Sequence, residues 1–278
     1  MHIPTPPADL HSVVRFALAE DIGSGDITAA LIPAANTVRA KIISRDQGIL
    51  CGGPWVDEIF NQLDPSLQIN WETEEGSSFE QGQVLAIVSG SARHILSAER
   101  TLLNFLQTLS ATATQSHRYA SLVAHTHVRL LDTRKTLPGL RSAQKYAVRV
   151  GGCYNHRMGL FDAFLIKENH ISACGDIDKT IKTARSLYPD KPVEIEVQNL
   201  AELEQALSAA ADIIMLDNFG ISQIKKAVAI NGGRSKLEAS GGIGGNTLVN
   251  IAETGVDYIS IGSLTKDCKA IDLSLLVE

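Results

Sequence analysis

The pattern of hydrophobic and polar positions changes near residue 127 and divides the chain of 278 residues into two parts. In the first part, apolar positions at helical spacing predict helices over residues 8–21, 54–63 and 91–123, the last as one helix or two. Strict alternation predicts half-buried, antiparallel strands over residues 38–42 and 67–71, and a further strand at the end of residues 76–90. The first part therefore combines helices with an antiparallel sheet.

In the second part, short apolar runs alternate with helical patterns. The runs end near Asp132, Ile166, Val197, Asp217, Ser240 and Gly262. Helical patterns follow the later runs, over residues 176–187, 200–211, 221–231 and 246–254. This alternation predicts parallel βα units, and nearly continuous apolar runs such as DIIMLDN suit a sheet that is buried on both faces. Six strands in a segment shorter than the ~250 residues of a full barrel favour an open or incomplete barrel, with a doubly wound sheet as the alternative.

Each of these predicted strands ends in chemically useful residues. In chain order they are Arg134 and Lys135, Lys167, Glu194 with Glu196, Asp217, Ser240-Gly241-Gly242, and Gly262-Ser263. Parallel barrels build their active sites from the carboxyl ends of several strands. The sequence therefore predicts a single site at that edge of the sheet.

The acidic residues among them predict a cluster of carboxylates. Glu194 and Glu196 are two positions apart on one strand and share a face, with Ile195 on the other. Together with Asp217 they need compensating cations, either Mg²⁺ or the two lysines Lys135 and Lys167. The alternative is an internal network of salt bridges without a metal.

The glycines after the last two strands suit a phosphate. Glycine lets backbone N–H groups approach phosphate oxygens closely, and the loops after the final strands of a barrel are a common phosphate site. SGG alone is a weak signal, and it becomes stronger beside the GS pair at the next strand end.

The chain is acidic, with a formal net charge of −6, yet residues 131–170 are strongly cationic. The lysines and arginines there are Arg134, Lys135, Arg141, Lys145, Arg149, Arg157 and Lys167. A local excess of this kind suits a small anion rather than a nucleic acid, which needs an extended basic surface. For three of them, spaced four apart on a predicted helix over residues 140–150, a solvated or subunit-facing stripe is an equal alternative.

Composition narrows the class of protein further. The first residues lack the features of a signal peptide, and no apolar run approaches membrane-spanning length. Four cysteines lie far apart without a C-x-x-C pair, which argues against a metal cage or a disulfide framework and favours a cytoplasmic protein. For Cys153, inside the cationic stretch, we expect a packing role.

Three motifs in the cationic stretch are familiar in order and spacing: LDTRKTLPGLR, GGCYNHRMGL and LIKENH. Together with EDIGSGDIT near Glu20 and KAIDLSL near the end of the sequence, they resemble the quinolinate phosphoribosyltransferases, which are decarboxylating nicotinate-nucleotide pyrophosphorylases. The resemblance implies an N-terminal α/β sandwich domain with dimer contacts over residues 1–110. It implies an incomplete parallel α/β barrel with a C-terminal tail over residues 111–278, as in type II phosphoribosyltransferases.

The activity that the resemblance implies is transfer of the phosphoribosyl group of 5-phosphoribosyl 1-diphosphate (PRPP) to the ring nitrogen of quinolinate. Loss of the adjacent carboxylate as CO₂ then gives nicotinate mononucleotide and pyrophosphate, a step of NAD biosynthesis. Mg²⁺ is the implied cofactor. The implied assembly is a homodimer or larger homo-oligomer with shared sites, and neither a membrane nor a nucleic acid is an implied partner.

Carried over position by position, the resemblance assigns roles to individual residues. The quinolinate ligands are Arg100 (supplied by the neighbouring subunit), Arg134, His156, Arg157 and Lys167. The PRPP ligands are Lys135, Glu196, Asp217, Ser240, Gly241, Gly262, Ser263 and Lys266. Of these, Lys135, Glu196 and Asp217 are the catalytic candidates, and Glu196 and Asp217 hold the metal directly or through PRPP. Lys266 departs from the pattern, because relatives often carry histidine there, which puts a proton-transfer role at that position in doubt.

Two other classes of protein fit parts of the same pattern. A Schiff-base aldolase would use Lys167 as its nucleophile, but it leaves the surplus arginines unexplained. A non-catalytic relative would have lost Arg100, Arg134 or Glu196, and all three are present. Within the transferases, an enzyme specific for nicotinate would need fewer cationic groups for a single carboxylate.

Overall fold

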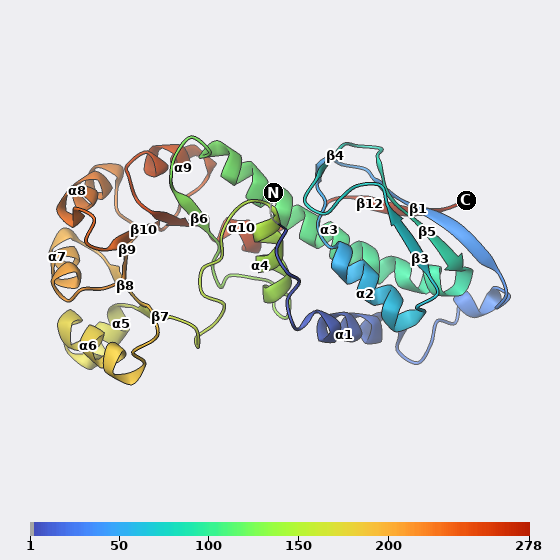
Figure 1. The fold of residues 1–278 in the computed structure, drawn as a ribbon, viewed down its shortest axis with the longest axis horizontal. Helices are drawn as coiled ribbons and strands as arrows, with labels where there is room; N and C mark the ends of the chain where they lie inside the picture. Colours follow the sequence, from blue (N-terminus) through green and yellow to red (C-terminus); the bar gives the residue numbers. More distant parts are fainter. Residues whose placement is uncertain (1–2) are drawn as a thin grey trace. The chain divides into compact units, whose positions relative to one another are not determined.

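The computed structural model describes residues 3–278, and these form two compact units (Figure 1). The first unit combines the chain up to Arg118 with Thr136–Gly152 and Leu264–Glu278, and the second combines Tyr119–Lys135 with Cys153–Ser263. The units therefore interleave along the chain, unlike the two contiguous domains expected from the sequence. The expected boundary at residue 110 lies inside one uninterrupted helix, α3 (Ala92–Leu122).

Two segments explain why the first unit gathers distant parts of the chain. Helix α4 (Arg141–Val150) buries Ala143, Tyr146 and Val150 in the hydrophobic core of this unit. Strand β12 (Leu273–Val277) pairs antiparallel with β1 (Thr37–Ser44), with Ala40 opposite Val277. The segment expected to be a C-terminal tail is thus an edge strand of the first sheet.

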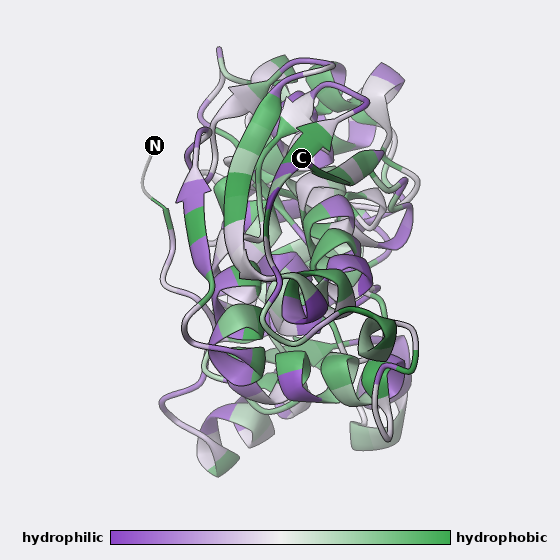
Figure 2. Cartoon of the chain, turned by 90° about the vertical axis from the view of Figure 1, so that its right-hand side faces the viewer, coloured by the Kyte–Doolittle hydropathy of each residue, from purple (hydrophilic) through white to green (hydrophobic). Residues whose placement is uncertain are grey.

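The first unit contains an antiparallel sheet in the order β12-β1-β5-β3, completed by β3 (Gln68–Trp71) and β5 (Val84–Ser91). The alternation predicted from the sequence places Ala40, Ile42 and Val88 on one buried face, and helices α2 (Gly53–Leu63) and α3 contribute to the same core. Figure 2 shows hydrophobic and hydrophilic stretches alternating along these strands and helices. The N-terminal sandwich is confirmed, with α3 as one helix.

Smaller elements complete this unit. They are α1 (Leu10–Ile22), the 3₁₀ helix η1 (Ala29–Leu31), and the short pair β2 (Gly48–Ile49) and β4 (Ser78–Phe79). The predicted helix over residues 8–21 is confirmed as α1.

The second unit is built on a parallel sheet of six strands in the order β6-β11-β10-β9-β8-β7. The strands are β6 (Arg129–Leu131), β7 (Phe164–Ile166), β8 (Val193–Val197), β9 (Ile213–Asp217), β10 (Lys236–Ser240) and β11 (Tyr258–Ser260). Consecutive strands are neighbours from β7 to β11, and the first strand, β6, pairs with the last, β11. This is a barrel that stays open between β6 and β7, so the incomplete barrel is confirmed and the doubly wound sheet is wrong.

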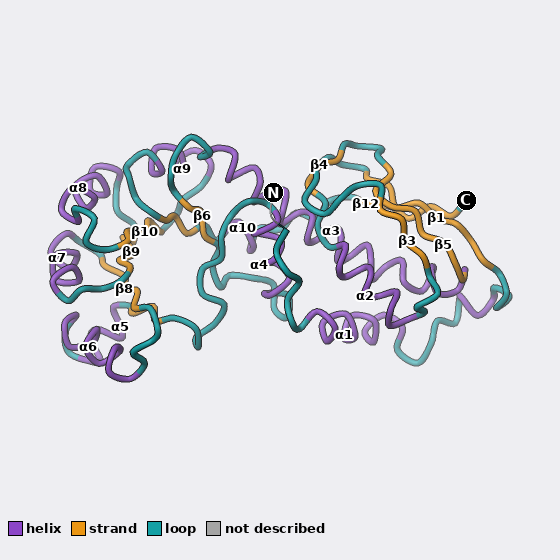
Figure 3. Tube along the Cα trace, in the orientation of Figure 1, coloured by secondary structure: helices purple, strands orange, loops and turns teal. Residues whose placement is uncertain are grey.

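Helices cover the outside of this sheet, and strands lie inside their arc (Figure 3). They are α5 (Glu168–Cys174), α6 (Ile177–Leu187), α7 (Leu200–Ser208), α8 (Ile221–Asn231) and α9 (Gly245–Ala252), whereas the short α10 (Ser263–Lys266) belongs to the first unit apart from Ser263. Two of them begin at side-chain caps, because Asp176 accepts a hydrogen bond from the Lys179 N–H and Asn199 from the Glu202 N–H.

The two faces of the second sheet differ in chemistry. Ile195, Ile214 and Leu237 lie on the helix-covered face and are buried. Glu194 and Glu238 lie on the opposite, inner face and are buried as well. The sheet is therefore buried on both faces, as expected, but only one of them is apolar. Among residues 3–278, no helix has the length and apolar character needed to cross a membrane.

Candidate active site

The predicted site residues of the second unit follow the carboxyl ends of its strands. Arg134 and Lys135 come after β6, Lys167 after β7, Glu196 lies in β8, Asp217 and Ser240 end β9 and β10, and Gly262 and Ser263 follow β11. The parallel register sets Ser240 directly opposite Asp217 and brings all of these ends to one edge. This arrangement is the one predicted from the sequence. Ser263 is also anchored in this unit, through a hydrogen bond of 3.4 Å to the Tyr119 hydroxyl.

Glu196 and Lys167 form an ion pair across the ends of β7 and β8. The Lys167 ammonium donates to Glu196 Oε2, and the other oxygen, Oε1, makes no hydrogen bond within residues 3–278. The lysine side chain is 46% exposed and the glutamate side chain 12%. Part of the salt-bridge alternative is therefore present, and Glu196 keeps one oxygen available.

Asp217 is held by a neutral partner instead. Asn218 Nδ2 donates to Asp217 Oδ2 at 2.9 Å, and Oδ1 has no hydrogen-bond partner among the described residues. Carboxylate oxygens on the ends of adjacent strands are the hard ligands that Mg²⁺ prefers. The chemistry of Glu196 and Asp217 thus fits the implied metal.

A fully buried acid, Asp132, shapes the loop that follows the NHR motif. Its two oxygens accept from the His156 backbone N–H at 2.9 Å and from Asn155 Nδ2 at 2.6 Å. The Tyr154 N–H also donates to the Leu130 carbonyl of β6. These bonds fix the position at which His156 enters the inner face of the sheet.

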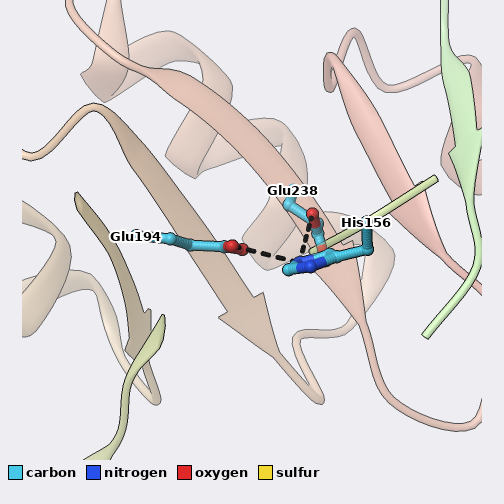
Figure 4. A group of neighbouring side chains, drawn as sticks. All are labelled: His156, Glu194 and Glu238. Atoms are coloured by element: carbon cyan, nitrogen blue, oxygen red, sulfur yellow. Dashed lines mark ion pairs between the residues drawn. The ribbon is translucent and has the colours of Figure 1, made fainter. Parts of the chain in front are cut away.

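His156 meets two glutamates on that inner face, Glu194 of β8 and Glu238 of β10 (Figure 4). Its Nε2 lies 3.0 Å from Glu194 Oε2 and 3.6 Å from Glu238 Oε2. Its Nδ1 accepts the Arg157 backbone N–H at 2.7 Å. Because Nδ1 is the acceptor, Nε2 carries the proton of a neutral imidazole and donates it towards Glu194.

The composition of this trio resembles that of a metal site, since the candidate ligand atoms of His156, Glu194 and Glu238 lie within 4.8 Å of one another. A metal needs a lone pair on Nε2, and the Arg157 N–H on Nδ1 leaves the proton on Nε2. With this hydrogen bond in place, His156 Nε2 has no lone pair to offer a metal.

Glu194 and Glu238 are two buried carboxyl groups with few hydrogen-bond donors. Glu238 is 0% exposed and Glu194 is 3% exposed, and Glu194 Oε1 and both Glu238 oxygens have no hydrogen-bond partner within residues 3–278. Burial, and then the charge of Glu194, raise the pKa of Glu238 to about 8, while His156 acts in the opposite direction. Near pH 7 the raised pKa keeps the Glu238 carboxyl group protonated.

The guanidinium groups of Arg134 and Arg157 lie near enough for their charges to interact, and Arg157 also interacts with Glu194. Burial, followed by the charge of Arg134, lowers the pKa of Arg157, while Glu194 and Asp162 act in the opposite direction. Arg157 Nη1 also donates to the Ala163 carbonyl at 3.2 Å, which fixes the side chain. Neighbouring guanidinium groups with planar, forked donors are suited to an anion with more than one carboxylate.

Two predicted site residues belong to the first unit. Arg100 is exposed on α3, and Lys266 forms an exposed ion pair of 3.0 Å with Asp267.

Lys145 corrects one expectation. It is 1% exposed, so it is not part of a solvated stripe, whereas Arg149 is exposed and Arg141 is half-buried with its Nε donating to Thr136 Oγ1. The apolar face of α4 is wider than its spacing suggested, because the residues on both sides of Lys145 are buried. Cys153 behaves as expected: it is buried, and burial followed by the charge of Asp132 raises the pKa of its thiol to about 12.

Sequence reasoning missed four residues that shape this site: Asp132, Asn155, Asn218 and Glu238. Glu238 had a usable signal, because it stands two positions before Ser240 and shares its face. The two-residue period that sets Glu194 beside Glu196 sets Glu238 beside Ser240. The roles of Asp132, Asn155 and Asn218 depend on hydrogen bonds that no local pattern predicts.

Comparison with known proteins agrees with this arrangement. Residues 112–276 match the family model of the quinolinate phosphoribosyl transferase C-terminal domain, and residues 26–110 match that of the N-terminal domain. A probable nicotinate-nucleotide pyrophosphorylase (carboxylating) of Bacillus subtilis is 38% identical, over 96% of this chain and 92% of its own. The chloroplastic nicotinate-nucleotide pyrophosphorylase of Oryza sativa subsp. japonica is 41% identical, over 98% of this chain and 79% of its own.

A solved structure is similar over the whole length. The nicotinate-nucleotide pyrophosphorylase from Francisella tularensis has a TM-score of 0.95 and 50% identity, covering 100% of this chain and 99% of its own. Family models, relatives and architecture lead to one conclusion. The chain belongs to the quinolinate phosphoribosyl transferase family.

Proposed function

We propose that this chain transfers the phosphoribosyl group of PRPP to the ring nitrogen of quinolinate, with release of CO₂, pyrophosphate and nicotinate mononucleotide. The observation that carries the proposal is the neighbouring pair of guanidinium groups, Arg134 and Arg157, at the sheet edge that also bears Glu196 and Asp217. Quinolinate has two carboxylates on adjacent ring carbons, so it can engage two separate forks. The product places the chain in NAD biosynthesis.

The acid substrate would lie against the cations that follow β6 and β7. Arg134 and Arg157 each offer a forked donor. Lys167 is the next cationic residue along the chain, and its side chain is exposed and ion-paired with Glu196. Charge-assisted hydrogen bonds of this kind contribute about 1.5–3 kcal/mol each. His156 has both ring nitrogens occupied within the protein, so we assign it the task of holding the Arg157 backbone rather than a carboxylate.

PRPP would lie at the ends of β8 to β11. Glu196 and Asp217 face its ribose hydroxyls or its metal, and the loop after Ser240 and the turn at Gly262–Ser263 receive its phosphates. A Cβ built on Gly244 meets no atom within 4 Å, so no packing inside the chain requires glycine there. Close approach of a phosphate is a sufficient reason for a bare backbone at that position.

The reaction needs charge stabilisation more than proton transfer. Departure of pyrophosphate leaves an oxocarbenium-like ribose, and Lys135 would neutralise the charge on the leaving group. Mg²⁺ bound to the diphosphate would supply further neutralisation of that charge. Glu196 and Asp217 would stabilise the positive charge that develops on the sugar.

Decarboxylation follows from the same placement. Once the ring nitrogen carries ribose it is cationic, and the electrons left behind by CO₂ are stabilised by the ring. The arginines then serve mainly to hold the two carboxylates in a fixed orientation away from bulk water. The charge of Glu194 favours the ionised guanidinium of Arg157 while no substrate is bound.

We further propose a homodimer or larger homo-oligomer in the cytoplasm, with Arg100 supplied to the site of a neighbouring subunit. Its exposed position on α3 leaves it accessible to a second copy. The aldolase alternative loses support, because Lys167 is 46% exposed and ion-paired with Glu196, whereas a Schiff-base lysine is activated by desolvation in an apolar pocket.

The test is direct. The purified chain is incubated with PRPP, Mg²⁺ and either quinolinate carrying a labelled 2-carboxylate or nicotinate, and labelled CO₂ and mononucleotide are followed. We expect CO₂ and nicotinate mononucleotide in equal amounts from quinolinate and little product from nicotinate. Product from nicotinate alone would identify a phosphoribosyltransferase specific for nicotinate, which has a single carboxylate. No product from either acid would support a non-catalytic relative.

A further inference from the structure

The end of β9 has an unusual backbone. Asn218, directly after Asp217, has φ +57°, and within residues 3–278 the only other non-glycine residue with positive φ is Ala210. Asparagine tolerates this left-handed conformation better than most residues, but it still persists only where surrounding contacts fix it. The contacts of Asn218 therefore need a reason.

Asn218 makes contacts in two directions. Its backbone N–H donates to the Ser240 carbonyl at 3.0 Å, and its Nδ2 donates to Asp217 Oδ2 at 2.9 Å. Adjacent residues in an extended strand point to opposite faces, so a side chain in regular β conformation could not reach the carboxylate of its predecessor in this way. The left-handed turn at Asn218 makes that contact available.

The third contact is with a glycine. A Cβ on Gly241 would lie 2.1 Å from Asn218 Oδ1 and 3.0 Å from Asn218 N, and Gly241 itself has φ +102°. No L side chain fits that space without moving Asn218. Asn218, at the end of β9, therefore packs directly against the backbone of the loop after β10, and this contact requires glycine at position 241.

We propose that Asn218 is a positioning residue that fixes the Asp217 carboxylate relative to the Ser240–Gly242 loop, and thereby sets the affinity for the magnesium–diphosphate end of PRPP. The inference rests on the proposed function, because it takes PRPP as the ligand of this edge. The donor is on Nδ2 and is neutral, so it orients Asp217 without competing with a cation for its charge. Asp217 Oδ1 stays free of hydrogen bonds within the described chain.

Glu196 provides the contrast within the same subsite. Its partner is the Lys167 ammonium, a charged group on a flexible and 46% exposed side chain. An ion pair of that kind exchanges readily when a cation or an anion binds. The amide of Asn218 sits on a constrained backbone, so Asp217 is the pre-arranged carboxylate of the two.

The informative variant is Asn218→Gly, because glycine adopts positive φ without strain and removes only the side chain. We expect the KM for PRPP and the Mg²⁺ concentration for half-maximal rate to rise about tenfold, as for loss of one hydrogen bond to a charged group. The KM for quinolinate should change by less than about twofold, on the same argument, since the arginines are untouched. The melting temperature should stay near that of the wild type.

Ala210→Gly is the matched control. Ala210 has φ 56° but follows α7, away from the site, so relief of backbone strain alone should leave both KM values unchanged. Asn218→Asp is the second variant: it keeps the size and backbone preference, removes the N–H donor and adds a charge next to Asp217. We expect it to impair PRPP use at least as much as Asn218→Gly.

Calorimetric titration of Mg·PRPP into each variant separates this inference from the proposed function. Weaker Mg·PRPP binding by Asn218→Gly than by Ala210→Gly supports the positioning role, even if turnover of quinolinate is absent. Unchanged Mg·PRPP binding and KM, or an equal rise of both KM values with a lowered melting temperature, would overturn it. Absence of turnover in the wild type with normal Mg·PRPP binding would count against the proposed function alone.

Discussion

Glu75 in the first unit and Glu238 in the second both have a pKa raised by burial, and the two carboxyl groups are held in opposite ways. In the first unit, Glu75 accepts hydrogen bonds from the Gly52 and Gly53 N–H groups, each at 3.0 Å, and from the Tyr146 hydroxyl at 3.1 Å. In the second unit, neither oxygen of Glu238 has a hydrogen-bond partner among the described residues. Burial raises the pKa of both, but only in Glu75 do backbone donors act strongly in the opposite direction.

The difference separates a structural acid from a functional one. Glu75 satisfies the first N–H groups of α2, where a helix favours negative charge, so it stabilises the fold. Glu238 is surrounded by Glu194 and His156 and keeps its proton at a cost in stability. Strongly perturbed groups of the second kind gather at functional sites. Glu75 thus serves the fold of the first unit, whereas Glu238 lies on the inner face of the sheet that bears the candidate site.

Arg100 gives the largest expected effect, because we expect it at quinolinate although it lies in the first unit. Arg100→Ala and Arg134→Ala homodimers should each be nearly inactive, since every site lacks one carboxylate ligand. When the two variants are unfolded and refolded together, half of the dimers should be mixed, and each mixed dimer has one intact site. About a quarter of the wild-type activity should return.

Subunit exchange must be shown independently, by mass labelling of one variant. If exchange is complete and no activity returns, Arg100 serves its own subunit and the shared site is wrong.

Asp217→Asn tests whether the second unit tolerates loss of a functional acid without loss of stability. Removing one charged ligand should lower kcat/KM for PRPP by about 10- to 100-fold. The free energy of unfolding should change by less than about 0.5 kcal/mol, because Asp217 is at the edge of the sheet. Steady-state kinetics and urea denaturation measure the two quantities, and full wild-type turnover in excess chelator would refute the metal role.

Glu75→Gln should show the opposite behaviour. The glutamine amide cannot accept hydrogen bonds from all three donors as the Glu75 carboxylate does. It also lacks the negative charge that the N-terminus of α2 attracts. We expect the free energy of unfolding to fall by about 2 kcal/mol, with both KM values unchanged. The matched variant in the second unit is Glu238→Gln, in which the amide replaces an already protonated carboxyl group. A similar loss of stability in both variants would remove the distinction between the two acids.

The pH dependence of stability gives the smallest effect. Glu238 has a folded-state pKa of about 8 against an ordinary value of 4.5, so between these pH values only the folded chain holds the proton. Unfolding then releases a proton, and this group lowers stability as pH rises through the window, by at most about 1.4 kcal/mol per pH unit. Chemical denaturation at pH 6 and 7.5 should show a shallower decline for Glu238→Gln than for the wild type. Parallel curves would mean that Glu238 is ionised in the folded chain.

The sequence was most informative where local period and strand ends decide the structure. Alternating strands and helices predicted six parallel strands, and the rule that sites lie at carboxyl ends brought Asp217, Ser240 and Lys167 to one edge. Both arguments need only short-range order. They hold because a buried parallel sheet leaves little freedom in how its strand ends meet.

The parts that could not be predicted depend on long-range register. Whether Glu238 meets Glu194 depends on how β10, β9 and β8 are aligned, and the protonation of His156 depends on the Arg157 backbone. The pairing of β12 with β1 joins segments from opposite ends of the sequence. No pattern within either segment encodes its partner.

That pairing has a consequence for the order in which the chain folds during synthesis. All six strands of the second unit leave the ribosome before β12. Every strand of the parallel sheet has therefore been synthesised while the first sheet still lacks its edge strand. The nascent first unit must wait with one side of β1 open to solvent or to other chains. The unit that begins first therefore finishes last, and its late closure is the step at which a chaperone that shields strand edges would have the most to protect.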